Sequence, residues 1–252
     1  MNNDHRDMEL EATLQEAIDS GNRVWVVGDI HGHIKTLEEL ISQIDLESGH
    51  KLISLGDMID RGPDSASVLE IFRRNPSFCA LKGNHEQMMH ESISIGKNRH
   101  WEPWLKYGGV ETLTSLGSKR EEGHIMDLEW SEFLAGLPTE IILKRFRLVH
   151  AGFDPDVSIE AQRDRDRLWS RKAFQSSTVL DNDRQIILGH TPVQEIVGHG
   201  SNSPWYSRIL LGDGRPSIIG IDTGICLKRA LNPTLTAVEL GSGDLVQVPR
   251  LD

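Results

Sequence analysis

The sequence predicts an α/β fold, and three observations lead to that expectation. Short apolar runs alternate along the chain with segments whose apolar residues recur at helical spacing, as in proteins built from alternating strands and helices. The chain has 252 residues, 38% of them hydrophobic, so it can bury a full core and fits one large α/β domain. Several apolar runs end beside a polar residue, where α/β sheets carry their functional side chains.

The first predicted element is an amphipathic helix over residues 8–19, where Leu10 and Leu14 recur at helical spacing. It precedes the first apolar run, so we expect residues 1–20 to form an N-terminal helical extension. Residues 21–252 are then expected to form a single domain.

Further helices are predicted after the first strands. Apolar periodicity predicts one over residues 34–44, and Pro63 opens another that should end before Pro76. A stretch between about 96 and 138 is rich in aromatic residues and too long for a simple connection. We expect it to be a helical insertion packed on the sheets, with a rim that is a candidate region for substrate selection.

Five predicted strands are each followed by polar residues. The apolar runs cover residues 24–27, 52–55, 79–81, 146–149 and 186–188. The polar residues that follow them are Asp29 and His31, Asp57, Asn84 and His85, His150, and His190. Single residues of these types usually serve turns or cores, but the repetition of one pattern favours a shared function. Because ligands in open α/β sheets gather at the carboxyl ends of strands, we expect these ends to converge on one site.

Six of these side chains are candidate metal ligands. They offer carboxylate, amide-oxygen and imidazole donors without a thiolate, and they are Asp29, His31, Asp57, Asn84, His150 and His190. This donor set suits Mn²⁺, Fe or Zn²⁺ better than a calcium cage or a soft-metal site. Six side chains exceed what one ion with an open catalytic position uses, so we predict two divalent ions that share a bridging carboxylate.

Composition excludes some classes of function. Lys and Arg number 27 and Asp and Glu 38, so the formal net charge is −11, which opposes non-specific binding to nucleic acid or to anionic membranes. A substrate that carries phosphate would need local positive charge. No apolar stretch resembles a membrane span or a signal peptide, so we expect a soluble, cytoplasmic protein. Cys79 and Cys226 lack metal-type spacing and are expected to be reduced.

Five short motifs carry a resemblance to a known family. In chain order they are GDIHG (28–32), GDMIDRG (56–62), GNHE (83–86), HAG (150–152) and GHT (189–191). They resemble the calcineurin-type metallophosphoesterases, and among these the phosphoprotein phosphatases, especially the compact bacterial and phage serine/threonine protein phosphatases. The resemblance covers roughly residues 22–248. It implies a four-layer α/β/β/α fold, with two mixed β-sheets packed face to face between flanking helices.

The resemblance also implies a role for each candidate ligand. In the family's pattern, Asp29 and His31 bind one metal ion, and Asp57 bridges the two ions. The second ion is bound by the three remaining candidates, Asn84, His150 and His190. The two divalent ions are expected to be Mn²⁺, with Fe or Zn²⁺ as alternatives.

Further residues are implied to act on the substrate. His85 would stay unligated and protonate the leaving oxygen, while Asp60 orients its imidazole. Arg61 and Arg171 match positions that grip the substrate phosphate, for which a guanidinium fork is suited. The eukaryotic and phage pattern usually has arginine at position 82, so Lys82 is a third candidate phosphate-binding residue, which offers charge but not bidentate geometry. The implied reaction is hydrolysis of a phosphomonoester by in-line attack of a metal-bridging hydroxide.

One function is favoured and two alternatives stay open. The favoured function is a serine/threonine protein phosphatase that acts on phosphorylated proteins or peptides and on small phosphomonoesters. Lys82 keeps open a bis(5'-nucleosyl)-tetraphosphate (diadenosine tetraphosphate) hydrolase, although Glu86 and the IDRG at 59–62 favour the phosphatase. The third alternative is a non-catalytic binding protein of the same fold, against which the complete set of ligand types argues. Asp222 lies at another predicted strand end, with no role assigned.

Overall fold

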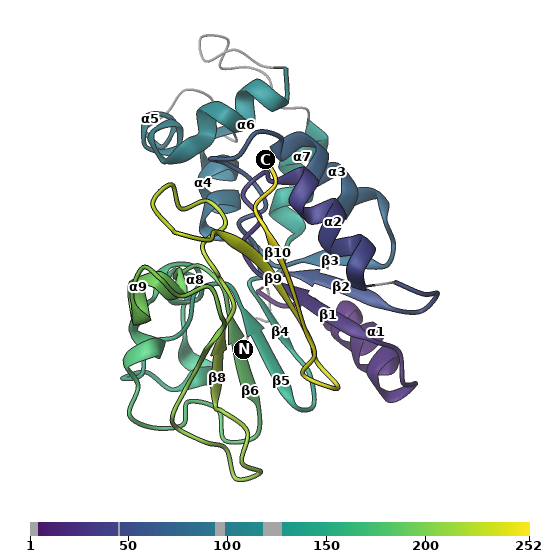
Figure 1. The fold of residues 1–252 in the computed structure, drawn as a ribbon, viewed down its shortest axis with the longest axis vertical. Coiled ribbons are helices and arrows are strands. Elements are labelled where there is room, and N and C mark those ends of the chain that lie inside the picture. Colours follow the sequence, from purple (N-terminus) through teal and green to yellow (C-terminus); the bar gives the residue numbers. More distant parts are fainter. Residues whose placement is uncertain (1–4, 45, 94–98, 118–127) are drawn as a thin grey trace.

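Two five-stranded mixed sheets pack face to face in the computed structural model, and helices flank them on the outside (Figure 1). The structure describes residues 5–44, 46–93, 99–117 and 128–252. The expected α/β class with two mixed sheets and flanking helices is therefore confirmed. Within the described residues, no helix has the length and apolar character needed to cross a membrane.

The first sheet joins strands from both ends of the chain, in the order β10-β9-β1-β2-β3. Its parallel strands are β1 (Val24–Val27), β2 (Lys51–Ser54) and β3 (Phe78–Ala80). β9 (Thr234–Glu239) pairs antiparallel with β1, and β10 (Leu245–Pro249) pairs antiparallel with β9. Strands from the end of the sequence thus complete a sheet that begins near residue 24.

The second sheet has the order β4-β5-β6-β8-β7. β5 (Phe146–Val149), β6 (Gln185–Leu188) and β8 (Ile218–Gly220) run parallel. The antiparallel edge strands are β4 (Glu140–Ile142) and β7 (Trp205–Tyr206). In each sheet the carboxyl ends of the parallel strands lie along the same end of the sheet. The loops that follow these strands therefore lie close together.

The α-helices of the described residues are short to medium in length. They are α1 (Met8–Asp19), α2 (Ile34–Ile44), α3 (Ser65–Arg74), α4 (Asn84–Ile93), α5 (Trp101–Trp104), α6 (Val110–Ser115), α7 (Leu128–Gly136), α8 (Asp164–Trp169) and α9 (Val193–Val197). α1 and α2 have the predicted bounds. α3 begins at Ser65 because the side chain of Asp64 caps it and accepts a hydrogen bond from the Ser67 amide at 2.9 Å.

The region expected to be a helical insertion contains α5, α6 and α7. Between α5 and α6, residues Leu105–Gly109 form a π-type turn in which Gly108 has a φ of 117°. Residues 96–98 and 118–127 of the expected insertion, and residues 1–4 of the expected N-terminal extension, lie outside the described residues. The proposed division of the chain into an extension and one domain stays a prediction.

Alternating side chains of the strands fill separate cores. In β1, Val24 and Val26 point into the core between the two sheets, whereas Trp25 and Val27 point into the core beneath the outer helices. A third core lies on the other face of the second sheet, where Val149 is buried. Strands buried on both faces are continuously apolar, which is why the sequence marked them as apolar runs.

Candidate metal centre

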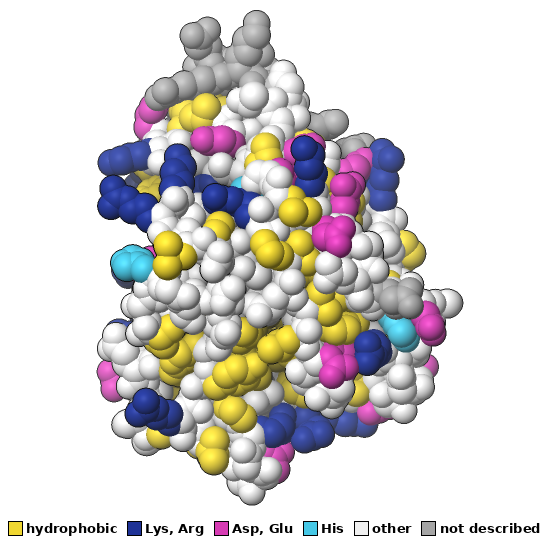
Figure 2. Space-filling view, in the orientation of Figure 1, with side chains coloured by type: hydrophobic (Ala, Val, Ile, Leu, Met, Phe, Trp, Pro, Cys, Tyr) yellow, Lys and Arg dark blue, Asp and Glu magenta, His cyan; other side chains and the backbone are white. Residues whose placement is uncertain are grey.

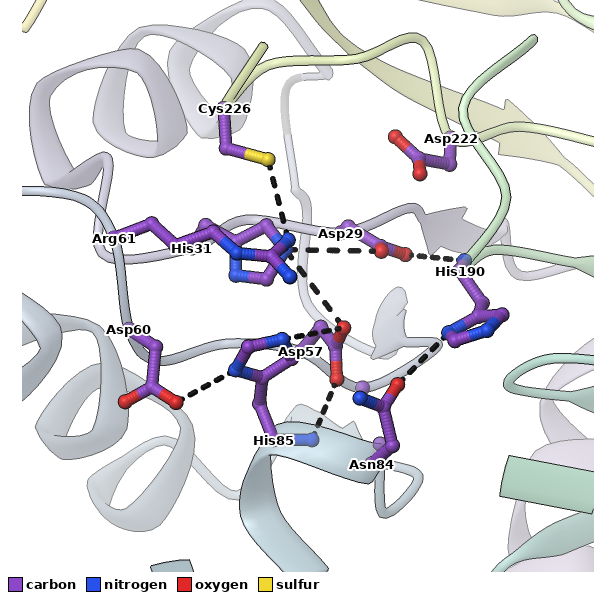
Figure 3. A network of polar contacts seen from close by, with 12 residues as sticks. Asp29, His31, Asp57, Asp60, Arg61, Asn84, His85, His190, Asp222 and Cys226 are labelled. Atoms are coloured by element: carbon purple, nitrogen blue, oxygen red, sulfur yellow. Dashed lines mark hydrogen bonds and ion pairs between the residues drawn. The ribbon is translucent and has the colours of Figure 1, made fainter. Parts of the chain in front are cut away.

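The loops after five strands bring polar side chains into one small region. Asp29 follows β1, Asp57 follows β2, and Asn84 begins α4 directly after β3. From the second sheet, His150 follows β5 and His190 follows β6. In Figure 3, Asp29, Asp57, Asn84 and His190 surround one common space. The structure thus brings together the strand ends that the sequence pattern predicts to converge.

One group of ligand-type atoms surrounds Oδ1 of Asn84. Burial lowers the pKa of His150, so its ring carries one proton at neutral pH, which Nδ1 donates to the carbonyl oxygen of Leu55 at 2.9 Å. Nε2 of His150 is then an acceptor, 2.9 Å from Oδ1 of Asn84 and 3.3 Å from Oδ1 of Asp57. Nδ1 of His190 lies 2.8 Å from the same Asn84 oxygen. Acceptor atoms that face one another in this way fit a bound cation.

A second group lies on the other side of Asp57. Nδ1 of His31 donates to the carbonyl oxygen of Ile59 at 2.8 Å, which leaves Nε2 as the acceptor of a neutral ring. This Nε2 lies 3.7 Å from Oδ2 of Asp57 and 4.0 Å from Oδ2 of Asp29. It also accepts a hydrogen bond from Nη1 of Arg61 at 2.7 Å. The two oxygens of Asp57 therefore face different groups of ligand atoms.

These residues fit a centre for two divalent ions. In the described part of the chain, His31, Asp57 and His85 form one cluster, and Asp57, His150 and His190 form another. Within each cluster the ligand-type atoms lie within 4.8 Å of one another, and Asp57 belongs to both. Imidazole nitrogens whose partner nitrogen is fixed by a backbone carbonyl are typical of metal-binding histidines. The donors include no thiolate, which matches the preferences of Mn²⁺, Fe and Zn²⁺.

His85 is oriented differently from the other site histidines. Its Nδ1 donates to Oδ2 of Asp60 at 2.6 Å, a carboxylate rather than a backbone carbonyl. Its Nε2 is buried, has no hydrogen-bond partner among the described residues, and lies 3.9 Å from Oδ2 of Asp57. Burial opposes protonation of this ring, but Asp57 and Asp60 outweigh it and raise the pKa of His85 above its ordinary value. The arrangement directs Nε2 of His85 toward the candidate metal ligands.

The backbone is strained at several positions of this site. In the described residues, the non-glycine positions with positive φ are His31, Asp57, Asp60, Arg61 and His190. All five belong to the candidate site. Left-handed conformations at such residues cost energy and persist where surrounding contacts enforce them, typically at functional sites.

Burial and neighbouring charges shift the pKa values of the acidic side chains in opposite directions. Burial and the nearby Asp222 and Asp57 raise the pKa of Asp29 well above its usual value. Burial also raises the pKa of Asp222 to about 6. Burial opposes the ionisation of Asp57 as well, but the surrounding histidines, His150 first among them, hold its pKa below the usual value. Asp57 is therefore the carboxylate most firmly held in the ionised form.

Three residues at this site were given no structural role by the sequence reasoning. Glu86, considered there only as a family marker, accepts hydrogen bonds at 2.8 Å from the backbone amides of Asp57, Met58 and Gly83. Trp104 and Thr112, from the region of the expected insertion, both donate to the carboxylate of Asp60. The place of Glu86 in the GNHE motif was an available signal, whereas nothing local marks Trp104 and Thr112.

The three candidate phosphate-binding residues are placed differently. Arg61 lies within the site and bonds to His31 and to Sγ of Cys226. Arg171 is half exposed and forms an ion pair with Glu195. Nζ of Lys82 donates to the carbonyl oxygen of Ala135 at 3.2 Å. It lines a cavity of about 580 Å³ together with Trp169 and others, and no described contact joins it to the candidate ligands.

Positive charge gathers locally despite the net charge of −11. On the face shown in Figure 2, Lys and Arg side chains cluster at the upper left, in the region of the view where Figure 1 shows α4 and α5. Such a cluster supplies the attraction for an anionic group that the overall charge does not.

The two cysteines are unpaired, as expected. Burial raises the pKa of Cys226 to about 12, which keeps it a neutral thiol beside Arg61.

Comparison with known proteins shows the family to which the chain belongs. Residues 22–219 match the family model described as calcineurin-like phosphoesterase. Serine/threonine-protein phosphatase 2 of Escherichia coli is 43% identical over 100 residues, which are 39% of this chain and 44% of that protein. The corresponding phosphatase 2 of Salmonella typhimurium is 31% identical over 168 residues, 65% of this chain and 75% of that protein. The symmetrical bis(5'-nucleosyl)-tetraphosphatase of a Shewanella strain is 29% identical over 160 residues, 62% of this chain and 54% of that protein.

A further relative, serine/threonine-protein phosphatase 1 of Salmonella typhimurium, is 39% identical over 79 residues. The chain spans well under two thirds of the length of two of these relatives, 44% of the Escherichia coli protein and 36% of the Salmonella phosphatase 1.

Solved structures share the fold at low sequence identity. A candidate diadenosine tetraphosphatase superposes with a TM-score of 0.63 at 19% identity, over 92% of this chain and 95% of that one. A serine/threonine phosphatase from Saccharomyces cerevisiae gives 0.56 at 14% identity, over 96% of this chain and 89% of that one.

Proposed function

Because the chain belongs to the calcineurin-like phosphoesterase family, we propose that it is a metal-dependent phosphomonoesterase, and within that class a serine/threonine protein phosphatase. One observation carries the proposal. The two oxygens of Asp57 face separate groups of ligand atoms, and the unpartnered Nε2 of His85 lies beside them. Two relatives named serine/threonine-protein phosphatase 2 support the choice of substrate class.

In this proposal Asp29 and His31 would hold one divalent ion, and Asp57 would contribute to holding both. The remaining ligands, Asn84, His150 and His190, would hold the second ion. Mn²⁺ is the proposed cation, with Fe or Zn²⁺ as alternatives, because the donors are oxygen and imidazole only. When bound, two such ions supply positive charge to the phosphoryl oxygens and lower the pKa of water.

The chain's own residues would then do the rest of the chemistry. Hydrolysis joins the oxygen of water to phosphorus and breaks the bond to the leaving oxygen, which needs a proton. His85 supplies that proton from Nε2, and Asp60 holds the ring through Nδ1. Arg61 lies closest to the candidate ligands and would bind the phosphate oxygens with its guanidinium. Arg171 would do the same after leaving its exposed pair with Glu195.

A second candidate function is hydrolysis of a dinucleoside tetraphosphate. It is favoured by the relatives named symmetrical bis(5'-nucleosyl)-tetraphosphatase and by Lys82, which replaces the arginine usual in the phosphatases. The same ligands and the same proton donor would serve either substrate. The cytoplasm is the proposed location, because two unpaired thiols suit a reducing compartment.

The test is an assay of the chain stripped of metal with a chelator and then reconstituted with Mn²⁺. We expect no hydrolysis of a phosphoserine peptide before reconstitution and full activity after it. Diadenosine tetraphosphate, assayed in parallel, should give a lower kcat/KM. Equal turnover with and without metal would refute the metal-dependent reaction, and a preference for the dinucleotide would replace the phosphatase by the second candidate.

A further inference from the structure

Asp60 is a fully buried carboxylate with three side-chain donors. His85 donates to its Oδ2 at 2.6 Å, and Thr112 donates to its Oδ1 at 2.6 Å. Trp104 places its indole Nε1 between the two oxygens, 3.0 Å from Oδ2 and 3.2 Å from Oδ1. The relative exposures of Asp60, Trp104 and Thr112 are each 0%. Solvent therefore cannot compete for these hydrogen bonds.

The segment 104–112, which carries Trp104 and Thr112, also holds the backbone at Asp60 and Arg61. Their φ angles are 71° and 70°, in the left-handed region that non-glycine residues seldom occupy. The amide of Asp60 donates to Oγ1 of Thr112 at 2.9 Å, so one hydroxyl contacts both its amide and its carboxylate. The amide of Arg61 donates to the carbonyl oxygen of Gly108 at 3.2 Å. Oγ of Ser65 also accepts from the Asp60 amide at 3.0 Å, so residues far along the chain act together with a near one to hold the strained conformation.

Two glycines make this approach possible. A Cβ atom on Gly108, whose own φ is 117°, would lie 2.7 Å from the backbone nitrogen of Arg61. A Cβ atom on Gly109 would lie 2.5 Å from the indole ring of Trp104. The kinked turn between α5 and α6 therefore brings Trp104, Gly108 and Thr112 onto the same loop residues, Asp60 and Arg61.

We propose that Trp104 and Thr112 are positioning residues for the Asp60–His85 pair. The proposal rests on the proposed role of His85 as the proton donor. With both oxygens of Asp60 fixed by donors from α5 and α6, the carboxylate can hold the His85 ring in only one orientation. That orientation directs Nε2 toward the candidate ligands, where it has no hydrogen-bond partner among the described residues. Part of the expected insertion is thereby assigned to the proton-transfer machinery.

A packing role alone does not account for these contacts. Trp101, the neighbouring indole, is also buried, and its ring centroid lies 5.7 Å from that of Trp104. It belongs to the same hydrophobic core as Trp104 and makes no described hydrogen bond to Asp60. Of these two described indoles, Trp104 alone aims its N–H at the carboxylate. At position 112 a hydroxyl is needed to contact the Asp60 amide and carboxylate together.

Matched variants separate positioning from packing. Trp104→Phe removes the indole N–H and keeps a ring, and Trp101→Phe makes the same change without touching Asp60. Thr112→Val removes the hydroxyl, and Thr112→Ser keeps it as the rescuing variant. We expect kcat for a phosphoserine peptide to fall about tenfold in Trp104→Phe and in Thr112→Val, with KM unchanged. Trp101→Phe and Thr112→Ser should stay within about twofold of the wild type.

The leaving group supplies a readout that packing would not move. For p-nitrophenyl phosphate, which leaves with little help from a proton, we expect both losses to stay below about threefold. In a His85→Asn background, neither Trp104→Phe nor Thr112→Val should lower activity further, because the donor they position is absent. Losses that persist in that background, or that match those of Trp101→Phe, would overturn the inference. Equal losses for both substrates in His85→Asn alone would instead refute the proposed function of His85.

A second measurement does not depend on activity. In Zn²⁺-loaded protein, the indole N–H resonance of Trp104 can be identified by its loss in Trp104→Phe. We expect this resonance to shift in Asp60→Asn, while that of Trp101 stays in place. A Trp104 resonance that does not move would overturn the inference, even if Trp104→Phe proved too unstable to assay.

Discussion

Asp57 and His150 meet across the boundary between the two sheets, with Nε2 of His150 3.3 Å from Oδ1 of Asp57. Asp57 follows β2 in the first sheet, and His150 follows β5 in the second. The other oxygen of Asp57 faces His31 at 3.7 Å, in the loop after β1. One carboxylate thus connects ligand atoms from both halves of the molecule.

Asp57→Asn should remove the shared negative charge and weaken both proposed metal sites. We expect the metal content to fall and kcat to drop by roughly a hundredfold or more. Atomic absorption and an assay with a phosphoserine peptide measure the two effects. Asp213→Asn, at an exposed position with an Arg215 partner, is the control and should change neither. A fully active, fully loaded Asp57→Asn protein would contradict the shared-ligand assignment.

His85→Asn should separate a proton donor from a metal ligand. Because Nδ1 of His85 is bonded to Asp60, we expect both metal ions to be retained and kcat to fall by roughly 10²–10⁴. His150→Asn is the comparison, since it removes a proposed ligand and should lower the metal content. Loss of one metal equivalent in His85→Asn would mean that His85 binds an ion.

Lys82→Arg tests substrate choice. A terminal phosphate offers more free oxygens to a guanidinium fork than an internal phosphate does, so the variant should hold or lower KM for a phosphopeptide. We expect the wild type to prefer phosphomonoesters to diadenosine tetraphosphate and the variant to widen that preference. The measurement is kcat/KM for both substrates in both proteins. A wild-type preference for the dinucleotide of more than about tenfold, or ~1.4 kcal/mol, would decide for the second candidate function.

The stability of the metal-free protein should depend on pH through Asp222. Burial raises its folded pKa to about 6 from an ordinary value of 3.8, so the folded protein binds the proton more tightly than the unfolded chain. The stabilisation from this proton is present below pH 3.8 and is lost as the pH rises through about 6. Relative to wild type, Asp222→Asn should therefore gain up to about 3 kcal/mol between pH 4 and pH 7.

Urea unfolding of the chelated proteins at the two pH values measures this gain. Asp213 supplies the opposite case, because its hydrogen bond from Arg215 lowers its pKa. Asp213→Asn should therefore lose rather than gain stability, relative to wild type, as the pH rises. A difference between wild type and Asp222→Asn that does not vary with pH would contradict the burial of an ionisable Asp222.

The strand ends could be predicted from the sequence because each is a local pattern. An apolar run followed by Asp29 or His150 is visible within a few residues, and parallel strands bring such ends together by their geometry alone. The bounds of α1 and α2 followed in the same way from apolar periodicity. The two-sheet arrangement came instead from the resemblance to a known family.

Contacts between distant segments could not be predicted in this way. Trp104 lies 44 positions from Asp60, and Thr112 lies 52 positions away, in a segment that the sequence marked for packing and as a candidate rim for substrate selection, not for contact with Asp60. The direction of Lys82 was equally hidden, because its Nζ is fixed by Ala135, 53 positions away. Such pairings depend on how separate elements dock, which no window of neighbouring residues records.

The position of β9 and β10 has a consequence for how the protein is made. β9 leaves the ribosome long after β1, the strand with which it pairs. Until residues 234–239 are synthesised, β1 is an open sheet edge whose backbone amides and carbonyls can pair with any other strand. A nascent chain of this protein would therefore need protection from aggregation until β9 has been synthesised, and chains truncated before residue 234 should be far less soluble than the 252-residue chain.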